Sequence, residues 1–364
     1  MDWPIAGLFV QIDALTIVQV IILGFVGGTL SGFIGSGGAF FMTPGMMNLG
    51  VQGVVAVGSN ITHKFGKAMV GSRKHGKMGN VDKKLAAFLL LTAFAGIRLA
   101  VMVSSMLFKG GGDSHHPTGA GANLYISLVF VCVLSVVSLS MLRDLARGSG
   151  EVGGPSRKIV DFFGRLRLPP MIHFKVAEVD VSLWILLLVG LATGYLAGTI
   201  GVGGFIGVPA MIYIFGIPTA VAAGTELYLA MFLGAFGALN YAWAGYVDLR
   251  LTLLLFLGSL VGVHLGAYGV KVVSEKYIRM TTALIILLCV ISRGVAIPMY
   301  LRQLGIVSFN PLWDTYINGV STVILYVSGI GGSGMILFQV LRAYRQRRKL
   351  QRTIAVARVP SPAA

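Results

Sequence analysis

Two stretches of the chain, GTLSGFIGSGG at 28–38 and GYLAGTIGVGG at 194–204, carry the same pattern of glycines 166 positions apart. Three further pairs recur at this spacing: AVGSN at 56–60 with AAGTE at 222–226, GNVD at 79–82 with GYVD at 245–248, and GIRL at 96–99 with GVHL at 262–265. The chain therefore consists of two related halves. Matching halves with glycine breaks inside apolar segments are typical of secondary transporters whose site lies between the repeats.

The composition predicts an all-α integral membrane protein. Hydrophobic residues make up 55% of the chain and charged residues 12%, and the mean hydropathy is +0.83. A helix needs about 20 apolar residues to cross the bilayer. Segments of this kind lie at 14–34, 85–107, 123–142, 182–200, 251–270, 280–300 and 315–341, whereas 39–49 and 204–216 are too short to cross alone.

The net charge of +16 is explained by topology rather than by nucleic-acid binding. Basic residues cluster in short connections and at the C-terminal end, a pattern typical of cytoplasmic loops of membrane proteins. The clusters lie at 73–84, 143–175, 271–279 and 342–352. The first 13 residues contain no Lys or Arg and no cleavage signal, so they are expected on the external side of the membrane, with the C-terminus in the cytoplasm.

The same rule predicts that the two halves have inverted topology. The loop at 79–82 lies in a strongly basic setting, whereas the equivalent loop at 245–248 has only Arg250 nearby. Equivalent loops on opposite faces require an odd number of crossings in each half. The short segments at 39–49 and 204–216 are therefore expected to form glycine-broken or re-entrant helices that meet near the membrane midplane.

These arguments divide the chain into six parts. The predicted linker contains an amphipathic helix with Ile159, Phe162, Phe163 and Leu166 on one face, and the basic end is expected to be disordered and attracted to anionic lipid. The parts are an external N-terminus (1–13), a first transmembrane repeat (14–145), a cytoplasmic linker (146–180), a second, inverted repeat (181–301), an additional transmembrane segment (302–341) and a cytoplasmic polybasic tail (342–364).

The glycine runs are the first candidate binding elements. Each precedes a short apolar helix whose start would present backbone N–H groups, and such helix starts attract anions. The alternative is that the glycines only allow close helix packing. The candidates are Gly35, Ser36, Gly37 and Gly38 in the first half and Gly201, Gly203 and Gly204 in the second.

The segment at 52–72 supplies candidate cations. Asn60, His63 and Lys67 are spaced i, i+3 and i+7, so they lie on one helical face, and Lys64 is adjacent. An ionisable group buried in lipid is expensive and normally marks a transport pathway. Lys67 has the alternative of extending to the membrane interface.

Further candidates are Arg98, with His264 as its equivalent, and Ser59, with Thr225 as its equivalent. Arg98 and His264 either line the route or form a structural tie to backbone carbonyls or to a helix C-terminus. Glu226 stands at the place of Asn60 and is the sole acidic residue between Asp180 and Asp248. A lone buried carboxylate suits the binding and release of a proton during a transport cycle, and a fixed ion pair with Lys67 or Arg98 is the alternative.

The doubled motifs SGFIGSGGAFFMTP and AGTIGVGGFIGVPA, followed by GSN and GTE and by GNVD and GYVD, resemble the TauE/SafE family of sulfite exporters over roughly residues 20–300. This family is also called the toluene-sulfonate uptake permeases. The resemblance implies movement of small sulfur-containing or carboxylate anions across bacterial inner membranes, driven by a proton gradient. It places the family's glycine turns on Gly35, Gly37, Gly38, Gly201, Gly203 and Gly204 and its small-polar pair on Ser59, Asn60, Thr225 and Glu226.

The predicted function is secondary transport of a small oxyanion such as sulfite or an organosulfonate, without catalytic residues, metal or cofactor. Its expected partners are the anion, protons and the lipid bilayer, and a homo-oligomer is compatible with the sequence. A thiol redox carrier using Cys132 and Cys289, another intramembrane enzyme and a passive channel are the alternatives. The two cysteines form neither a disulfide framework nor a metal-ligand motif.

Overall fold

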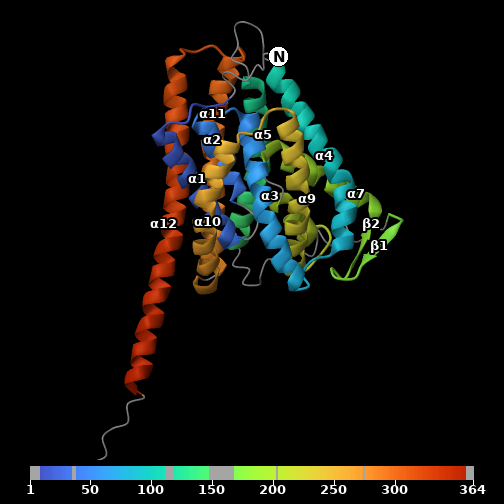
Figure 1. Cartoon of the computed structure of the whole chain (residues 1–364), viewed down its shortest axis with the longest axis vertical. Coiled ribbons are helices and arrows are strands. Elements are labelled where there is room, and N and C mark those ends of the chain that lie inside the picture. The colour runs from blue at the N-terminus through green and yellow to red at the C-terminus, as the bar shows by residue number, and fades with distance from the viewer. Residues whose placement is uncertain are drawn as a thin grey trace, which may run out of the picture.

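The computed structural model describes residues 9–34, 38–110, 119–146, 168–201, 204–273 and 275–357. These residues form an all-α membrane fold with a short two-stranded hairpin (Figure 1). Eight helices are long and apolar enough to cross a membrane, within the described ranges. The helices of the first half are α1 (Ala14–Ile34), α2 (Ala39–Asn48), α3 (Gly53–Lys77), α4 (Lys83–Lys109) and α5 (Ala120–Ala146).

The second half repeats this series after the hairpin of β1 (Met171–Phe174) and β2 (Val179–Ser182). Its helices are α7 (Leu183–Ile200), α8 (Gly204–Tyr213), α9 (Thr219–Trp243), α10 (Leu249–Val272) and α11 (Glu275–Gln303), and α12 (Leu312–Ala357) follows them. α1 ends at Ile34 and α2 begins at Ala39, and α7 ends at Ile200 and α8 begins at Gly204. Separate helices therefore lie on either side of both glycine runs, as the sequence predicts. The spanning segment Ala220–Trp243 in α9 adds to the seven apolar stretches found from the sequence.

The short helix α2 folds back along α1. A Cβ atom on Gly38 would lie 1.5 Å from the carbonyl oxygen of Gly27, and one on Gly45 would lie 2.4 Å from Leu23. At 10 residues, α2 is about 15 Å long and too short to cross the bilayer. All of its residues are buried. The amino-terminal end of α2 therefore lies beside the middle of α1, inside the bundle.

The two halves pack through equivalent pairs of helices. α1 runs parallel to α10, with Gly28 against Ser259, and α4 runs parallel to α7, with Gly194 against Ala93. These two contacts join residues that are exchanged by the 166-residue spacing. The glycines are required because a Cβ atom on Gly194 would lie 2.0 Å from the Ala93 carbonyl oxygen.

α3 and α9 pack against each other at the centre of the bundle in opposite directions (Figure 1). Gly58, near the start of α3, meets the carbonyl of Tyr246, just beyond the end of α9. Gly224, near the start of α9, meets the carbonyl of Asn80, just beyond the end of α3. These are again equivalent contacts of the two halves.

The loops after α3 and α9 end at equivalent aspartates that begin the next helix. Asp82 accepts a hydrogen bond from Leu85 N at 2.9 Å and, through its other oxygen, from the backbone N–H groups of Val176 and Ala177 at 3.1 Å each. Asp248 instead accepts from Arg250 N and pairs with its guanidinium at 2.8 Å. Only the first aspartate therefore fastens the hairpin to the bundle.

The hairpin and the basic end of α12 differ from the expected linker and tail. The predicted amphipathic helix at 159–166 lies outside the described residues. The predicted disorder of the tail is wrong as far as residue 357, because α12 continues to Ala357 as a helix beyond the bundle (Figure 1). Arg, Lys, Gln, Leu and Ala dominate this extension, and all are strong helix formers.

Replacing Gly194 with alanine is expected to destabilise the α4–α7 contact. The added methyl group meets a backbone carbonyl that cannot move easily, and overpacking of this kind costs about 1–3 kcal/mol. Thermal unfolding of the purified protein in detergent measures the effect. Gly319→Ala in α12 is the matched control, since a Cβ atom there has nothing within 4 Å. Equal melting temperatures for both variants would contradict the packing argument.

Candidate functional site

A small cavity lies at the amino-terminal end of α2, where α1, α2, α3 and α9 meet. Its volume is about 30 Å³, enough for one or two water molecules. It is lined by Ser31 of α1, Gly38 and Ala39 at the start of α2, His63, Lys64, Lys67 and Ala68 of α3, and Leu227 of α9. The lining therefore contains three basic side chains and no acidic one.

The α3 side chains that face this region follow the predicted helical stripe. His63 is 2% exposed, and its Nε2 lies 2.8 Å from the Ser259 hydroxyl of α10. Its ring also stands edge-on to Phe256, with centroids 5.8 Å apart. The other ring nitrogen, Nδ1, is buried and has no hydrogen-bond partner. Lys64 and Lys67 are half-buried.

Asn60 joins the two broken helices, one turn before His63. Its Nδ2 donates hydrogen bonds of 2.8 Å to the Ala39 carbonyl and to the Thr43 hydroxyl of α2. Thr43 in turn donates to the carbonyl of Ile200, the last residue of α7, at 3.2 Å. The Oδ1 of Asn60 is buried without a partner. The breaks in α1–α2 and α7–α8 thus meet at one asparagine.

Gly201 lies at this junction, and its position requires a glycine. Its φ is +75°, in the left-handed region, which residues with a Cβ atom rarely adopt. A Cβ atom there would also lie 3.1 Å from Asn60 Nδ2. Gly204 begins α8 and is buried. The other predicted glycine-run residues, Gly35, Ser36, Gly37 and Gly203, lie outside the described residues.

Glu226 is an acidic residue that directly precedes the lining residue Leu227 in the chain. It is 1% exposed, and both carboxylate oxygens are buried without a hydrogen-bond partner. A Cβ atom on Gly207 of α8 would lie 2.1 Å from Oε2, so the carboxylate is held against α8. Its charge interacts with that of Lys64, and no direct ion pair joins the two. The fixed pair with Lys67 or Arg98 is likewise not seen.

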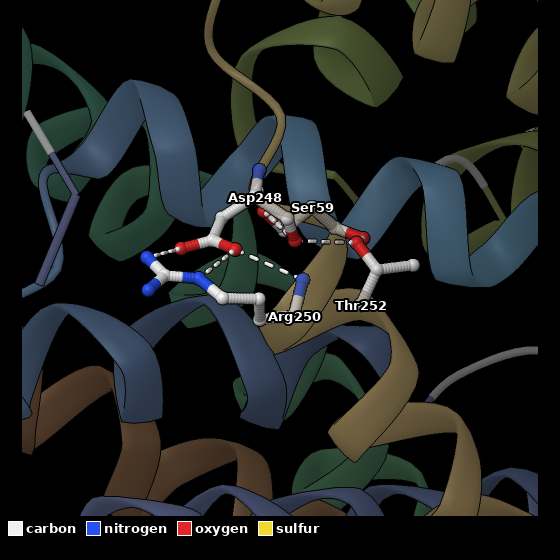
Figure 2. A network of polar contacts seen from close by, with 4 residues as sticks. All are labelled: Ser59, Asp248, Arg250 and Thr252. Carbon is white, nitrogen blue, oxygen red and sulfur yellow. Dashed lines mark hydrogen bonds and ion pairs between the residues drawn. The ribbon is translucent and has the colours of Figure 1, made fainter. Parts of the chain in front are cut away.

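Ser59 and Thr225 are placed away from the cavity, in equivalent structural roles. Ser59 receives a hydrogen bond of 3.0 Å from Asp248 N and lies 3.3 Å from the Asp248 carbonyl, and Thr252 donates to the Ser59 carbonyl at 3.3 Å (Figure 2). Thr225 accepts from Asp82 N at 3.0 Å. Each residue anchors the loop of the opposite half.

Arg98 and His264 lie on the outside of the bundle rather than in the cavity. Arg98 is exposed and donates to Asn240 of α9 at 2.9 Å. His264 is exposed, with Nδ1 at 2.7 Å from the Leu260 carbonyl of its own helix. The thiols are also elsewhere, because Cys132 is exposed on α5 and Cys289 is buried in α11. The cavity lining contains none of these four.

Lys64 is the lining residue that the sequence argument undervalued. It is four residues after Asn60, and therefore on the same helical face as the three selected positions. The spacing places Lys64 on this face, and the tertiary structure shows that the face lines the cavity. No group of three or more His, Cys, Asp or Glu side chains that could hold a metal ion occurs among the described residues.

Comparison with known proteins finds a matching family and several related membrane transporter proteins. Residues 20–293 match the family described as sulfite exporter TauE/SafE. The chain is 26% identical to the probable membrane transporter protein YjnA of Bacillus subtilis (strain 168), over 74% of this chain and 96% of that protein. It is 24% identical to the probable membrane transporter protein YunE of the same organism, over 75% of this chain and 96% of that protein. No solved structure matches it significantly.

These relatives are named as membrane transporters and not as enzymes. The match and the eight apolar helices identify a multi-pass membrane transporter. The family match ends within α11, so α12 lies beyond it.

Proposed function

Because the chain belongs to the TauE/SafE family of sulfite exporters, we propose that it is a secondary transporter of a small oxyanion, with sulfite or an organosulfonate as substrate. The observation that carries the proposal is the cavity in which His63, Lys64 and Lys67 face the start of α2. The positive end of the helix dipole and the basic side chains have the same sign there. Both favour the binding of an anion.

The chemistry of the lining suits an oxyanion better than a sugar or a cation. Lysine ammonium groups donate strong, charge-assisted hydrogen bonds to anionic oxygens. The unpaired Nδ1 of His63 adds a ring nitrogen that can donate in the appropriate tautomer. An interior without acidic lining residues binds cations poorly. A pyramidal sulfur oxyanion offers several acceptor oxygens to these converging donors.

Alternating access between inverted repeats is part of this proposal. The cavity of about 30 Å³ is smaller than a sulfur oxyanion, so the lining helices must separate for binding. The antiparallel packing of α3 and α9 and the exchanged glycine contacts support two equivalent halves that rock about a shared site. The two broken helices supply the short elements whose tilt opens or closes it.

Glu226 is the proposed proton carrier. It is a buried carboxylate without hydrogen-bond partners, it lies against α8, and its charge interacts with Lys64. Protonation of Glu226 removes a negative charge close to the anion site. Proton binding and anion binding would then favour each other, which is the thermodynamic requirement for coupled transport.

We place the protein in the bacterial inner membrane, with the N-terminus outside and the C-terminus in the cytoplasm. The hairpin that follows the basic linker and the basic end of α12 lie at the same end of the bundle (Figure 1). Clustering of basic segments at one end supports this orientation.

Binding measurements on the purified protein test the substrate class. We expect sulfite and small sulfonates to raise the melting temperature, with a larger shift at low pH than at high pH because Glu226 binds a proton. Sulfate, thiosulfate and oxalate in the same assay rank the anions. A panel in which no anion stabilises the protein at either pH would refute the proposed substrate class.

A further inference from the structure

The largest fully buried side chain of the described residues is an arginine far from the cavity. Arg293 of α11 is 1% exposed. Its guanidinium donates hydrogen bonds to Asn48 Oδ1, to the Ser321 hydroxyl at 3.3 Å and to the Tyr300 hydroxyl at 3.3 Å. In the described part of the chain, no carboxylate forms an ion pair with it. Arg293 is thus a buried cation surrounded by neutral polar groups.

The additional helix α12 closes this cluster. The Ser321 hydroxyl lies 3.2 Å from Asn48 Oδ1 and 2.8 Å from the Ser292 carbonyl, and Asn318 Nδ2 donates to the Asn48 carbonyl at 3.3 Å. Asn48 is the last residue of α2. The carboxyl-terminal end of α2 therefore accepts hydrogen bonds from both α11 and α12.

The energetics of the cluster point to positioning rather than to stability. A cation at the carboxyl-terminal end of a helix interacts favourably with the helix dipole. A buried charge nevertheless loses its hydration, and Arg293 Nε has no hydrogen-bond partner. Apolar side chains of similar volume often stabilise such a contact as well or better. What the polar cluster adds is a directional attachment of one specific residue, Asn48.

The attachment acts on an element of the candidate site. α2 is a rod of about 15 Å, with Asn48 at one end and Ala39, in the cavity lining, at the other. α12 also touches the first turn of α2, since a Cβ atom on Gly329 would lie 2.2 Å from the Phe41 ring. A tilt at Asn48 would move both Ala39 and the bonds that Asn60 makes to α2.

The second half has a different arrangement at the equivalent place. The residue 166 positions after Asn48 is Ile214. It packs against an apolar cluster that includes Phe174 of the hairpin. The polar attachment thus distinguishes α2 from α8 within the described residues.

We propose that Arg293 is a positioning residue for the transport site: together with Ser321 of α12 it anchors α2, so that the start of α2 keeps its place in the cavity. This proposal rests on the proposed function for its link to anion binding. The anchoring itself is independent of the substrate.

Hydrogen–deuterium exchange of the full-length protein tests the anchor without any ligand. Arg293→Gln and the milder Ser321→Ala are expected to accelerate exchange in peptides covering 39–48 at least fivefold and to leave peptides covering 204–213 unchanged. Ser328→Ala is the matched control, because Ser328 is equally buried on α12 but donates to the Ile285 carbonyl of α11. Equal acceleration of exchange in α2 and α8, or the same effect from Ser328→Ala, would refute the proposal that Arg293 and Ser321 anchor α2.

Sulfite binding by calorimetry tests the link to the site. Ser321→Ala and Arg293→Gln are expected to raise the sulfite dissociation constant about tenfold, and Arg293→Lys, which keeps the charge, to raise it less. Loosened exchange in α2 with unchanged sulfite affinity would overturn the positioning role. Wild-type protein that binds no anion would instead refute the proposed substrate class, and the exchange result would still decide whether Arg293 and Ser321 anchor α2.

Discussion

Replacing Lys67 with methionine is expected to reduce sulfite flux roughly 100-fold. Methionine keeps much of the side-chain volume and removes a cation from the cavity lining. A charge-assisted hydrogen bond to the anion contributes about 1.5–3 kcal/mol, and each 1.4 kcal/mol corresponds to about a factor of ten. Uptake of labelled sulfite into proteoliposomes under a fixed pH gradient measures the loss. His63→Ala also removes a lining side chain, and we expect it to abolish sulfite flux.

The matched control is Lys77→Met. Lys77 is the last residue of the same helix and is exposed, so its loss changes the net charge equally without changing the cavity. The Lys67→Met and Lys77→Met proteins should both insert into the membrane and melt at similar temperatures. Normal flux in Lys67→Met and His63→Ala would remove both residues from the anion site.

Replacing Glu226 with glutamine is expected to abolish flux driven by a pH gradient while sulfite binding persists. Glutamine has nearly the same shape against Gly207 but cannot exchange a proton. Without a proton carrier, the gradient has no means of driving the anion. Two measurements separate the steps: calorimetry for binding, and proteoliposome flux with and without a pH gradient.

Glu178→Gln provides the comparison for this experiment. Glu178 is exposed in the turn between β1 and β2, and its replacement should leave pH-driven flux unchanged. A Glu226→Gln protein that still accumulates sulfite in response to a pH gradient would show that another group carries the proton.

Much of the architecture follows from the spacing of glycines and apolar residues. The repeat at 166 positions predicted which helices are equivalent, and glycine runs within apolar segments predicted the two broken helices. These are local properties, because a 10-residue apolar segment such as α2 cannot cross a bilayer. The helical stripe of Asn60, His63 and Lys67 was equally legible, since residues three and four apart share a helix face.

The roles of the small polar residues could not be predicted from the sequence pattern in this way. Ser59 and Thr225 stand beside Asn60 and Glu226 in sequence but turn toward the aspartates of the opposite half. Arg98 occupies a central position along α4, yet faces outward to Asn240. Depth along a helix can be counted from the sequence. The direction in which a side chain faces depends on helices that are far away in the chain.

The amino-acid sequence by itself determined the membrane class, the two equivalent halves, the helix breaks and the basic face of α3. Only the tertiary structure decided that Asn60 joins both breaks, that Lys64 lines the cavity and that Arg293 holds α2 from α11 and α12. Hydrophobic periodicity and glycine spacing act within one helix and can be read in order along the chain. A cavity and a polar cluster arise where several helices meet, because only folding sets the distances between them.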